Sequence, residues 1–256
     1  MIHKQTHQKV SNALMRDIFS RKLKPGDKLP SERELSDSMN VDRTTLRVAL
    51  KQLESMKLLE IRRGDGIYVN DFLKHAGIDF LRVLFSNNNP NDELAADMFI
   101  LDEVWEWWII QFPEMIKLAA TRASARDFKE LSDTMDREIE LKNDREKLID
   151  LWLEQQDFIA AAVNNMVMTL IFNSTRPLRR SILRIFLESI PPEQTEQFIN
   201  AKKTLMMEFL LNYGDKLDHY VDQYRLILSE QRQLTRNKLI QNMSSGTTPS
   251  PTPQSG

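Results

Sequence analysis

The sequence predicts a mainly α-helical protein, with a small β-hairpin near its N-terminus and an all-helical bundle in the remainder of the chain. Two observations carry this prediction. Four of the seven glycines lie in the first 80 residues, so tight turns and strands concentrate there. From about residue 90 to residue 243, apolar residues recur at spacings of three and four, which is the period of an amphipathic helix.

Composition narrows the class of protein further. The 256 residues are 41% hydrophobic and 28% charged, which suits one or two globular domains. The absence of cysteine excludes disulfides, thiolate metal sites and cysteine nucleophiles. We find no apolar run long enough for a signal peptide or for a membrane span, and we expect a cytoplasmic protein.

Charge is distributed unevenly along the chain. Residues 1–72 hold 14 basic and 10 acidic side chains, a net charge of +4, whereas the remainder holds 21 and 27, a net charge of −6. A basic N-terminal part on an acidic body indicates a polyanionic partner for the N-terminal part.

The first expected elements are two helices. Residues 8–20 form one, since Val10, Leu14 and Ile18 recur every four residues. A second, short helix begins after Ser31, because Ser31 and Glu34 have the spacing of a capping box, and it ends near residue 39.

A third helix follows after a tight turn. Asn40 suits the left-handed geometry of that turn, and Asp42 suits the N-cap of the next helix. Two short helices joined in this way describe a helix-turn-helix. The inner face of the third helix is expected to hold Leu46, Ala49, Leu50 and Leu53.

The outward residues near the start of this third helix match the chemistry of base recognition. Arginine donates two hydrogen bonds to guanine, and threonine contacts a thymine methyl group or a phosphate. In a helix-turn-helix this end of the second helix enters the major groove. The residues concerned are Arg43, Thr44, Thr45 and Arg47. A solvated, capped helix end is the alternative interpretation.

A β-hairpin is expected next. Residues 59–63 and 67–69 are rich in β-formers, and they flank the turn Gly64-Asp65-Gly66. Arg62 and Arg63 lie at the tip, where they would approach a phosphate or the minor groove. This hairpin is the predicted wing.

The remainder predicts a helical bundle. One helix starts at a capping box of Ser124 and Asp127 and continues to Lys142, and residues 144–173 form a single long helix. Pro177, the Pro191-Pro192 pair and Gly214 interrupt the pattern, and the last helix begins at Asp215. The domains predicted are a winged helix-turn-helix over 1–72, a linker over 73–84, a helical effector and dimerisation domain over 85–243, and a disordered tail over 244–256.

The segment from Pro25 to Val69 resembles the DNA-binding domain of the GntR family. The motifs are Pro-Gly-x-x-Leu-Pro-Ser-Glu-Arg-Glu-Leu, Val-x-Arg-Thr-Thr-Leu-Arg and a Gly-x-Gly wing, and an all-helical remainder is typical of the FadR-type branch. The resemblance implies a homodimer on a two-fold symmetric duplex operator. It also implies DNA contacts from Arg33, Arg43, Thr44, Thr45, Arg47, Arg63 and Gly64.

The chain departs from this branch where its relatives hold a metal through one Asp and three His. The equivalent positions fall near Trp152 and on Gln156, and the chain has only four histidines, so we expect no metal and no cofactor. Many relatives use an arginine to bind a carboxylate, and the equivalent position in this chain falls near Trp108.

An apolar ligand therefore suits the helical part better than a small hydroxy acid. Trp108, Trp152 and the methionines Met166 and Met168 would line its pocket, unless they are ordinary core. A basic run, Arg176, Arg179, Arg180 and Arg184, would meet the polar end of the ligand, unless it is a solvated face. The predicted ligand-binding residues are Trp108, Trp152, Gln156, Asn173 and Arg179.

These observations predict a DNA-binding transcription regulator and not an enzyme, since the sequence contains no phosphate loop, nucleophile elbow or metal constellation. The expected effector is a long-chain acyl-CoA or a fatty acid. The alternatives are a regulator that senses a small carboxylic acid and an architectural DNA-binding protein without effector.

Overall fold

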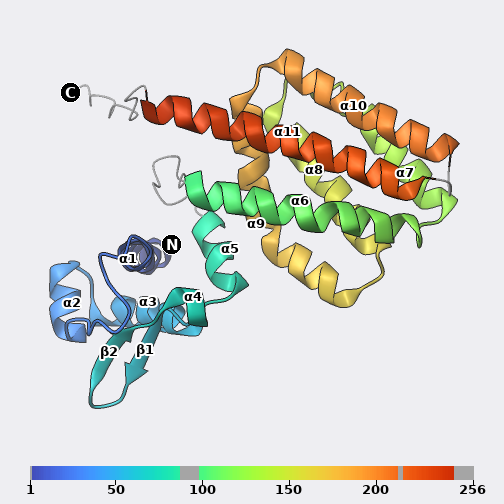
Figure 1. Ribbon diagram of the computed structural model, residues 1–256. Helices are drawn as coiled ribbons and strands as arrows, with labels where there is room; N and C mark the ends of the chain where they lie inside the picture. The colour runs from blue at the N-terminus through green and yellow to red at the C-terminus, as the bar shows by residue number, and fades with distance from the viewer. Residues whose placement is uncertain (1, 87–97, 213–215, 245–256) are drawn as a thin grey trace. The chain divides into compact units, whose positions relative to one another are not determined.

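The computed structural model describes residues 2–86, 98–212 and 216–244, and the chain divides into two compact units, Met1–Leu84 and Phe85–Gly256. The N-terminal unit combines helices with one two-stranded antiparallel sheet (Figure 1). Its elements are α1 (Ile2–Phe19), α2 (Glu32–Ser38), α3 (Arg43–Ser55), β1 (Leu59–Arg62), β2 (Gly66–Val69), α4 (Phe72–His75) and most of α5 (Ile78–Ser86).

The core of the N-terminal unit forms where α1 packs against α3. Both helices contribute the faces that the apolar spacing predicts, and between them Ser11 donates a hydrogen bond of 3.0 Å to Gln52. Burial removes this apolar surface from water and stabilises the unit. The buried side chains are Val10, Leu14, Met15 and Ile18 of α1 and Leu46, Ala49, Leu50 and Leu53 of α3.

The hairpin is confirmed, but its turn lies one residue earlier than expected, because β1 ends at Arg62 and β2 begins at Gly66. Leu59 pairs with Val69 and Arg62 with Gly66, so the loop lies between residues 62 and 66. The segment before α2 continues the sheet at one edge: the Leu29 amide donates to the Ile67 carbonyl at 2.8 Å. The hairpin is thereby attached to the unit by backbone hydrogen bonds.

Residues 73–84, expected as a linker, are helical over most of their length. They belong to α4 and α5, and they are attached to α1 through aromatic side chains. The ring centroid of Phe72 lies 5.7 Å from those of Phe19 and Phe80, and Phe80 is buried. Phe72 and Phe80 thus extend the packed N-terminal unit beyond its hairpin.

The second unit is a bundle of long helices. In Figure 1 α6 runs beside α11, and the close contacts of this pair and of α8 with α9 support the arrangement. The elements are α6 (Met98–Ala120), α7 (Ala125–Asp136), α8 (Arg145–Ala162), α9 (Met166–Ser189), α10 (Pro192–Leu211) and α11 (Leu217–Ser244).

Two expected helix boundaries are wrong. The helix that starts at the Ser124 capping box ends at Asp136 and not at Lys142, because the next residues form turns that place Glu138 in the interior. The predicted single helix over 144–173 is broken in two. Asn164 adopts a left-handed conformation (φ 50°), and Asn165 caps α9 by accepting the Met168 amide at 3.1 Å.

The sequence indicated that Pro177 interrupts a helix, and this is wrong. It lies inside α9, which continues to Ser189. An interior proline destabilises a helix by about 3 kcal/mol. Burial of the neighbouring Leu178 and Ile182 offsets this, since each fully buried aliphatic side chain stabilises by roughly 1.5–3 kcal/mol.

The other expectations for the C-terminal half have mixed outcomes. The break between α9 and α10 at Pro191-Pro192 is confirmed. Gly214 and Asp215 lie outside the described residues, as does the expected tail over 244–256 except for Ser244, which is the last residue of α11. Within the described ranges, no helix is both long and apolar enough to cross a membrane.

Candidate functional site

Two side-chain caps fix the helix-turn-helix. Ser31 and Glu34 form the predicted capping box of α2, with the Ser31 amide donating to the Glu34 carboxylate at 2.8 Å. At the start of α3, the Thr45 hydroxyl and amide donate to Asp42 at 2.6 and 2.9 Å. The same bonds lower the pKa of Asp42, so this cap is ionised at neutral pH.

The exposed start of α3 presents two of the predicted contact residues without internal partners. Arg43 and Thr44 are exposed, and the side chain of Arg43 forms no hydrogen bond or ion pair within the described part of the chain. Thr45 was predicted to point outward too, and this is wrong: its side chain is 6% exposed and its hydroxyl is bound to Asp42. Position 45 lies one turn before the buried Ala49, so it faces the core.

Further cations surround this helix end. Arg47 is exposed but pairs with Glu32 at 2.7 Å. Arg33 is exposed, and in the described ranges it has no ion-pair partner. One exposed apolar residue, Val48 (49% exposed), lies one turn after Thr44. Sequence analysis missed it, although its position on the outer face follows from the spacing of the buried residues of α3.

The hairpin tip holds a compact set of charges. Arg62 is paired with Glu60 at 2.8 Å and lies over the Tyr68 ring, 4.3 Å from its centroid. Arg63 and Gly64 are exposed, and Gly64 has a φ of 76°, which favours glycine. Of the two tip arginines, only Arg63 has no partner in the described structure.

The loop itself is fixed by Asp65. Its carboxylate accepts from the Tyr68 hydroxyl at 2.9 Å and lies 3.4 Å from Nζ of Lys28. The bond from Tyr68, followed by that from Lys28, lowers the pKa of Asp65. No local signal could have identified Lys28, because it lies 37 residues away in the sequence.

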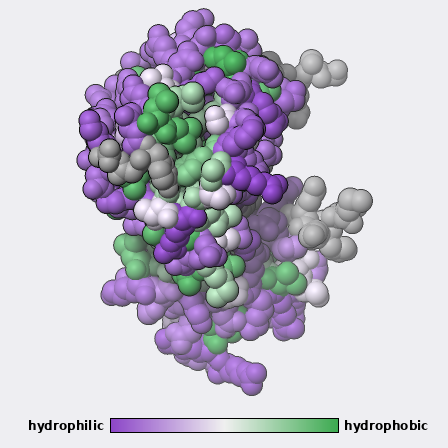
Figure 2. Space-filling view, turned by 90° about the vertical axis from the view of Figure 1, so that its right-hand side faces the viewer, coloured by the Kyte–Doolittle hydropathy of each residue, from purple (hydrophilic) through white to green (hydrophobic). Residues whose placement is uncertain are grey.

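The helical unit contains a partly open cavity of about 160 Å³, to which α6 through α11 all contribute. Four of the five predicted ligand-binding residues line it: Trp108, Trp152, Gln156 and Arg179. The fifth, Asn173, is exposed on α9 and is not part of the wall. Figure 2 shows one face of the molecule, on which apolar side chains gather among hydrophilic ones.

The cavity wall is mostly aromatic and aliphatic. The Trp108 ring stacks on Phe112 at 4.3 Å, and both are buried. The predicted methionines do not contribute: Met166 is 75% exposed, and neither it nor Met168 lines the cavity. They lie at the start of α9, which the expected unbroken helix would have placed differently.

A buried ion pair underlies one part of the wall. Glu138 is fully buried, and it is bound by Lys202 at 2.6 Å, by Gln155 at 2.6 Å and by the Trp152 indole at 3.0 Å. Trp152 therefore lines the cavity and also donates a hydrogen bond to the buried Glu138. Burial, and secondly the charge of Glu138, raises the pKa of the nearby Tyr224, which keeps this phenol neutral.

Arg179 occupies another part of the wall. It is 1% exposed and donates to Gln156 at 2.8 Å, to Asp157 at 2.7 Å and to the Phe172 carbonyl at 3.1 Å. Its Nε atom is the single buried side-chain nitrogen or oxygen without a hydrogen-bond partner in the described ranges. Arg176 also pairs with Asp157.

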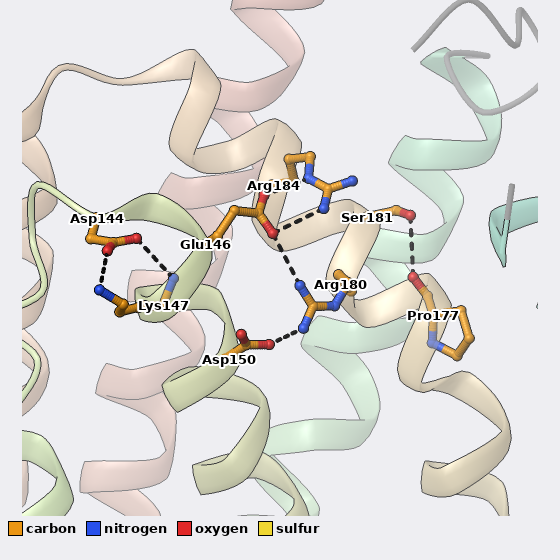
Figure 3. Close-up of polar contacts among 8 residues, drawn as sticks. All are labelled: Asp144, Glu146, Lys147, Asp150, Pro177, Arg180, Ser181 and Arg184. Carbon is orange, nitrogen blue, oxygen red and sulfur yellow. Dashed lines mark hydrogen bonds and ion pairs between the residues drawn. The ribbon is translucent and has the colours of Figure 1, made fainter. Parts of the chain in front are cut away.

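The rest of the basic run on α9 lies in an ion-pair network with α8 (Figure 3). Arg184 forms two bonds with Glu146, at 3.0 and 3.1 Å, and Arg180 pairs with Glu146 and Asp150. These two arginines are half-buried and bound to α8, so they are not the solvated face of the alternative interpretation, and neither of them lines the cavity.

Among the described residues, no three His, Cys, Asp or Glu side chains lie close enough together to hold a metal ion. His219 is exposed on α11, where it contacts the ring of Tyr220.

The fold and its exposed helix end define a DNA-binding transcription regulator with a winged helix-turn-helix. The family model of bacterial regulatory proteins, gntR family, matches residues 6–69. The HTH-type transcriptional regulator Mce2R of Mycobacterium tuberculosis is 30% identical over 174 residues, which cover 66% of this chain and 68% of that protein. The chain therefore belongs to the GntR family of bacterial regulatory proteins, and like its relatives it is a regulator and not an enzyme.

Two further comparisons are more limited. A fatty acid metabolism regulator protein of Shewanella frigidimarina is 36% identical over 87 residues, 34% of this chain and 36% of that protein. The solved structure of Lar, which controls the expression of the Listeria monocytogenes agr system, covers 93% of this chain at 17% identity, with a TM-score of 0.53. At this identity the second similarity concerns the fold alone.

Proposed function

We propose that the chain binds a two-fold symmetric operator as a homodimer, and that a ligand in the helical unit controls its affinity for that operator. The observation that carries DNA binding is Arg43, exposed and without an internal partner at the capped N-terminus of α3. Because bacterial DNA lies in the cytoplasm, this function places the protein there.

The exposed residues suit distinct parts of a duplex. Arg43 suits hydrogen bonds to guanine O6 and N7 in the major groove. Thr44 suits a hydrogen bond to a phosphate or an apolar contact with a thymine methyl group, and Val48 suits an apolar contact with the methyl group of a second thymine. Arg47 reaches a phosphate if it leaves Glu32. In the wing, Arg63 and the backbone of Gly64 suit a phosphate, as does Arg33 near the start of α2. The buried Thr45 is not part of this proposed surface.

Operator binding is tested by fluorescence anisotropy on a site selected from random DNA. At about 0.15 M salt we expect the selected site to bind at least about a thousandfold more tightly than scrambled DNA. Arg43→Ala should lose about 5- to 150-fold, which corresponds to about 1–3 kcal/mol. Lys129→Ala, an exposed change on α7, is the matched control. Equal binding to scrambled DNA would contradict the proposal.

A homodimer is supported by an exposed apolar stripe on α9. Met166, Val167, Leu170 and Ile171 are 75, 60, 57 and 41% exposed, and their spacing places them on one helix face. Leu170→Glu should shift sedimentation toward the monomer. Leu211→Glu replaces another exposed leucine, 82% exposed at the end of α10, and should leave the sedimentation unchanged. A Leu170→Glu protein that remains dimeric would remove this stripe from the interface.

The effector proposed is an acyl compound, either a fatty acid or a long-chain acyl-CoA. The aromatic wall beside Trp108 and Phe112 supports it, and the partial similarity to a fatty acid metabolism regulator agrees with it. A sensor of a small carboxylic acid and an architectural protein without effector are the competing functions.

Titration of the protein–operator complex separates these functions. A hundredfold change in operator affinity with palmitate or palmitoyl-CoA would require about 2.7 kcal/mol of differential binding and would support the acyl effector. A response to lactate alone would favour the small-acid sensor, and no response to any of the three would favour the architectural protein.

A further inference from the structure

The outer surface of α3 is arranged as two rows of side chains. Residues four apart in a helix lie one above the other on the same face. By this spacing Arg43, Arg47 and Lys51 form a basic row. Thr44 and Val48 form a neutral row beside it, and all five side chains are exposed. Val48 therefore continues the surface that begins with Thr44, one of the proposed DNA contacts.

Val48 is the apolar member of this surface. It is 49% exposed, and in α3, all of whose residues are described, it is the one exposed side chain that is apolar. The next residue of its row, Gln52, is engaged with α1, where it accepts a hydrogen bond from Ser11 at 3.0 Å. Helix stability does not explain a valine here, since lysine and alanine are better helix formers.

The cations that flank Val48 along the helix are held by carboxylates. Nε of Arg47 donates to Glu32 at 2.7 Å, and Nζ of Lys51 donates to Glu54 at 2.6 Å. These acidic partners balance the charge on either side of Val48. Its methyl groups thus determine the character of this part of the surface.

The major groove of DNA offers one kind of apolar group to such a side chain. The base edges there carry hydrogen-bond donors and acceptors, except for the methyl group on C5 of thymine. An apolar side chain over any other base edge would remove polar groups from water without bonding them, which is unfavourable. 5-Methylcytosine carries a methyl group on the same ring atom, so the shared chemistry is the 5-methyl group of a pyrimidine.

A single exposed apolar residue is ordinary on a protein surface, but this one lies on the helix face that the proposed function places in the groove. Arg43 and Val48 are five residues apart, which is about 7.5 Å along the helix axis. Successive base pairs are about 3.4 Å apart. A helix that lies in the groove therefore places the two contacts within about three base pairs of each other.

We propose that Val48 contacts the 5-methyl group of one pyrimidine in each half-site of the operator, within about three base pairs of the guanine bound by Arg43. This rests on the proposed operator binding, to which it adds a specificity-determining residue and the group that this residue recognises. Operator affinity then depends on one methyl group in each half-site, and it responds to methylation of a cytosine at that position.

Deoxyuridine lacks only the methyl group of thymine, so it tests the contact without a change in the protein. Each thymine of the selected operator is replaced in turn in one half-site, and the affinity of the full chain is measured by fluorescence anisotropy at about 0.15 M salt. We expect one replacement within about three base pairs of the guanine to weaken binding about fourfold, the fold-change that corresponds to burial of one methyl group.

Variants assign this loss to Val48. Val48→Ser should bind the thymine operator about fourfold less tightly per half-site than the original chain, and deoxyuridine at the sensitive position should cost it nothing further. Ile110→Ser replaces another exposed aliphatic side chain, 55% exposed on α6, and should behave as the original chain does in both measurements. Equal midpoints of urea unfolding check that both variants are folded, as expected at exposed positions.

A cytosine at the sensitive position separates the two sources of the methyl group. Methylation of this cytosine at C5 should raise the affinity of the original chain about fourfold and leave that of Val48→Ser unchanged. Such a gain supports recognition of the methyl group as such. Absence of a gain would overturn the response to cytosine methylation and leave thymine as the group recognised.

Two results would overturn the proposal and leave operator binding intact. One is a scan in which no deoxyuridine weakens binding by more than about twofold, which is less than the burial of one methyl group provides. The other is a Val48→Ser protein that loses as much affinity as the original chain at the sensitive position. Equal affinity for the selected and the scrambled DNA would contradict the proposed function as well.

Discussion

Thr44 and Thr45 are neighbours in the sequence with the same side chain, and the structure gives them different tasks. Thr44 is exposed, whereas Thr45 is 6% exposed and donates its hydroxyl to Asp42 at 2.6 Å. Replacing each by valine keeps the shape and removes only the hydroxyl. The two variants therefore separate a role in DNA contact from a role in folding.

For Thr45→Val the loss is one side-chain hydrogen bond to an ionised cap. The Thr45 amide still donates to Asp42 at 2.9 Å, and the carboxylate remains accessible to water, so no buried group is left unpaired. We expect the free energy of unfolding to fall by about 1 kcal/mol. For Thr44→Val, an exposed change, it should stay within about 0.5 kcal/mol.

Operator affinity should show the reverse order. Thr44→Val removes a proposed hydrogen bond to DNA and should weaken binding about fivefold, equivalent to about 1 kcal/mol. Thr45→Val should bind normally once the folded fraction is taken into account. Urea unfolding followed by circular dichroism and anisotropy with the selected operator measure the two quantities. Unchanged stability of Thr45→Val together with a tenfold loss of affinity would refute the inward assignment of Thr45.

Two further predictions concern the hairpin and the helical unit. Gly66→Ala should destabilise the N-terminal unit by about 1–3 kcal/mol in urea, since φ is 143° there, a backbone conformation that residues with a Cβ rarely adopt; the flexible end of Lys28, 2.5 Å from the added Cβ, can move aside, and unaltered unfolding would contradict the backbone strain. Asp102→Asn should lower stability by about 1–2 kcal/mol at neutral pH, because Arg232 holds this carboxylate through two bonds of 2.7 Å and lowers its pKa. A lowered carboxyl pKa stabilises the fold above the unfolded value of 3.8 and this contribution disappears as the pH falls through the folded value, so thermal unfolding of the two proteins should converge in acid. A difference that persists at low pH would contradict the ion pair as its source.

The N-terminal unit was predictable because its signals are local. Ser31 and Asp42 each cap a helix within three residues, and the glycines of the hairpin mark a turn whose strands follow directly. The orientation of Thr45 was also accessible, since its spacing of four from Ala49 places both on the inner face of α3. The attachment of Lys28 to Asp65 was not, because it depends on pairing between distant segments.

The helical unit was harder to predict because its interior mixes polar and apolar side chains. Asn164 and Asn165 break the expected long helix, and an Asn pair is a recognisable signal for a left-handed turn followed by a cap. The burial of Glu138 depends on partners from α8 and α10, which no local pattern identifies.

The basic run on α9 shows the same limit. By composition Arg179 and Arg180 are equivalent, but Arg179 lies at helical spacing from Phe172, Thr175 and Ile182, all of which are buried. Helical periodicity can separate the inner arginine from the outer one. The unused donor on the inner arginine depends on where its acceptors lie, and only the three-dimensional arrangement gives that.

Base-specific recognition by α3 is tested most directly by combining Arg43→Ala with single base-pair changes across the selected operator, with each affinity measured by anisotropy. If Arg43 reads a guanine, the variant should lose discrimination at one symmetry-related position in each half-site, by about 1–3 kcal/mol, and retain it elsewhere. A uniform loss of affinity, with discrimination preserved at every position, would contradict base readout by this residue and leave it only a phosphate contact.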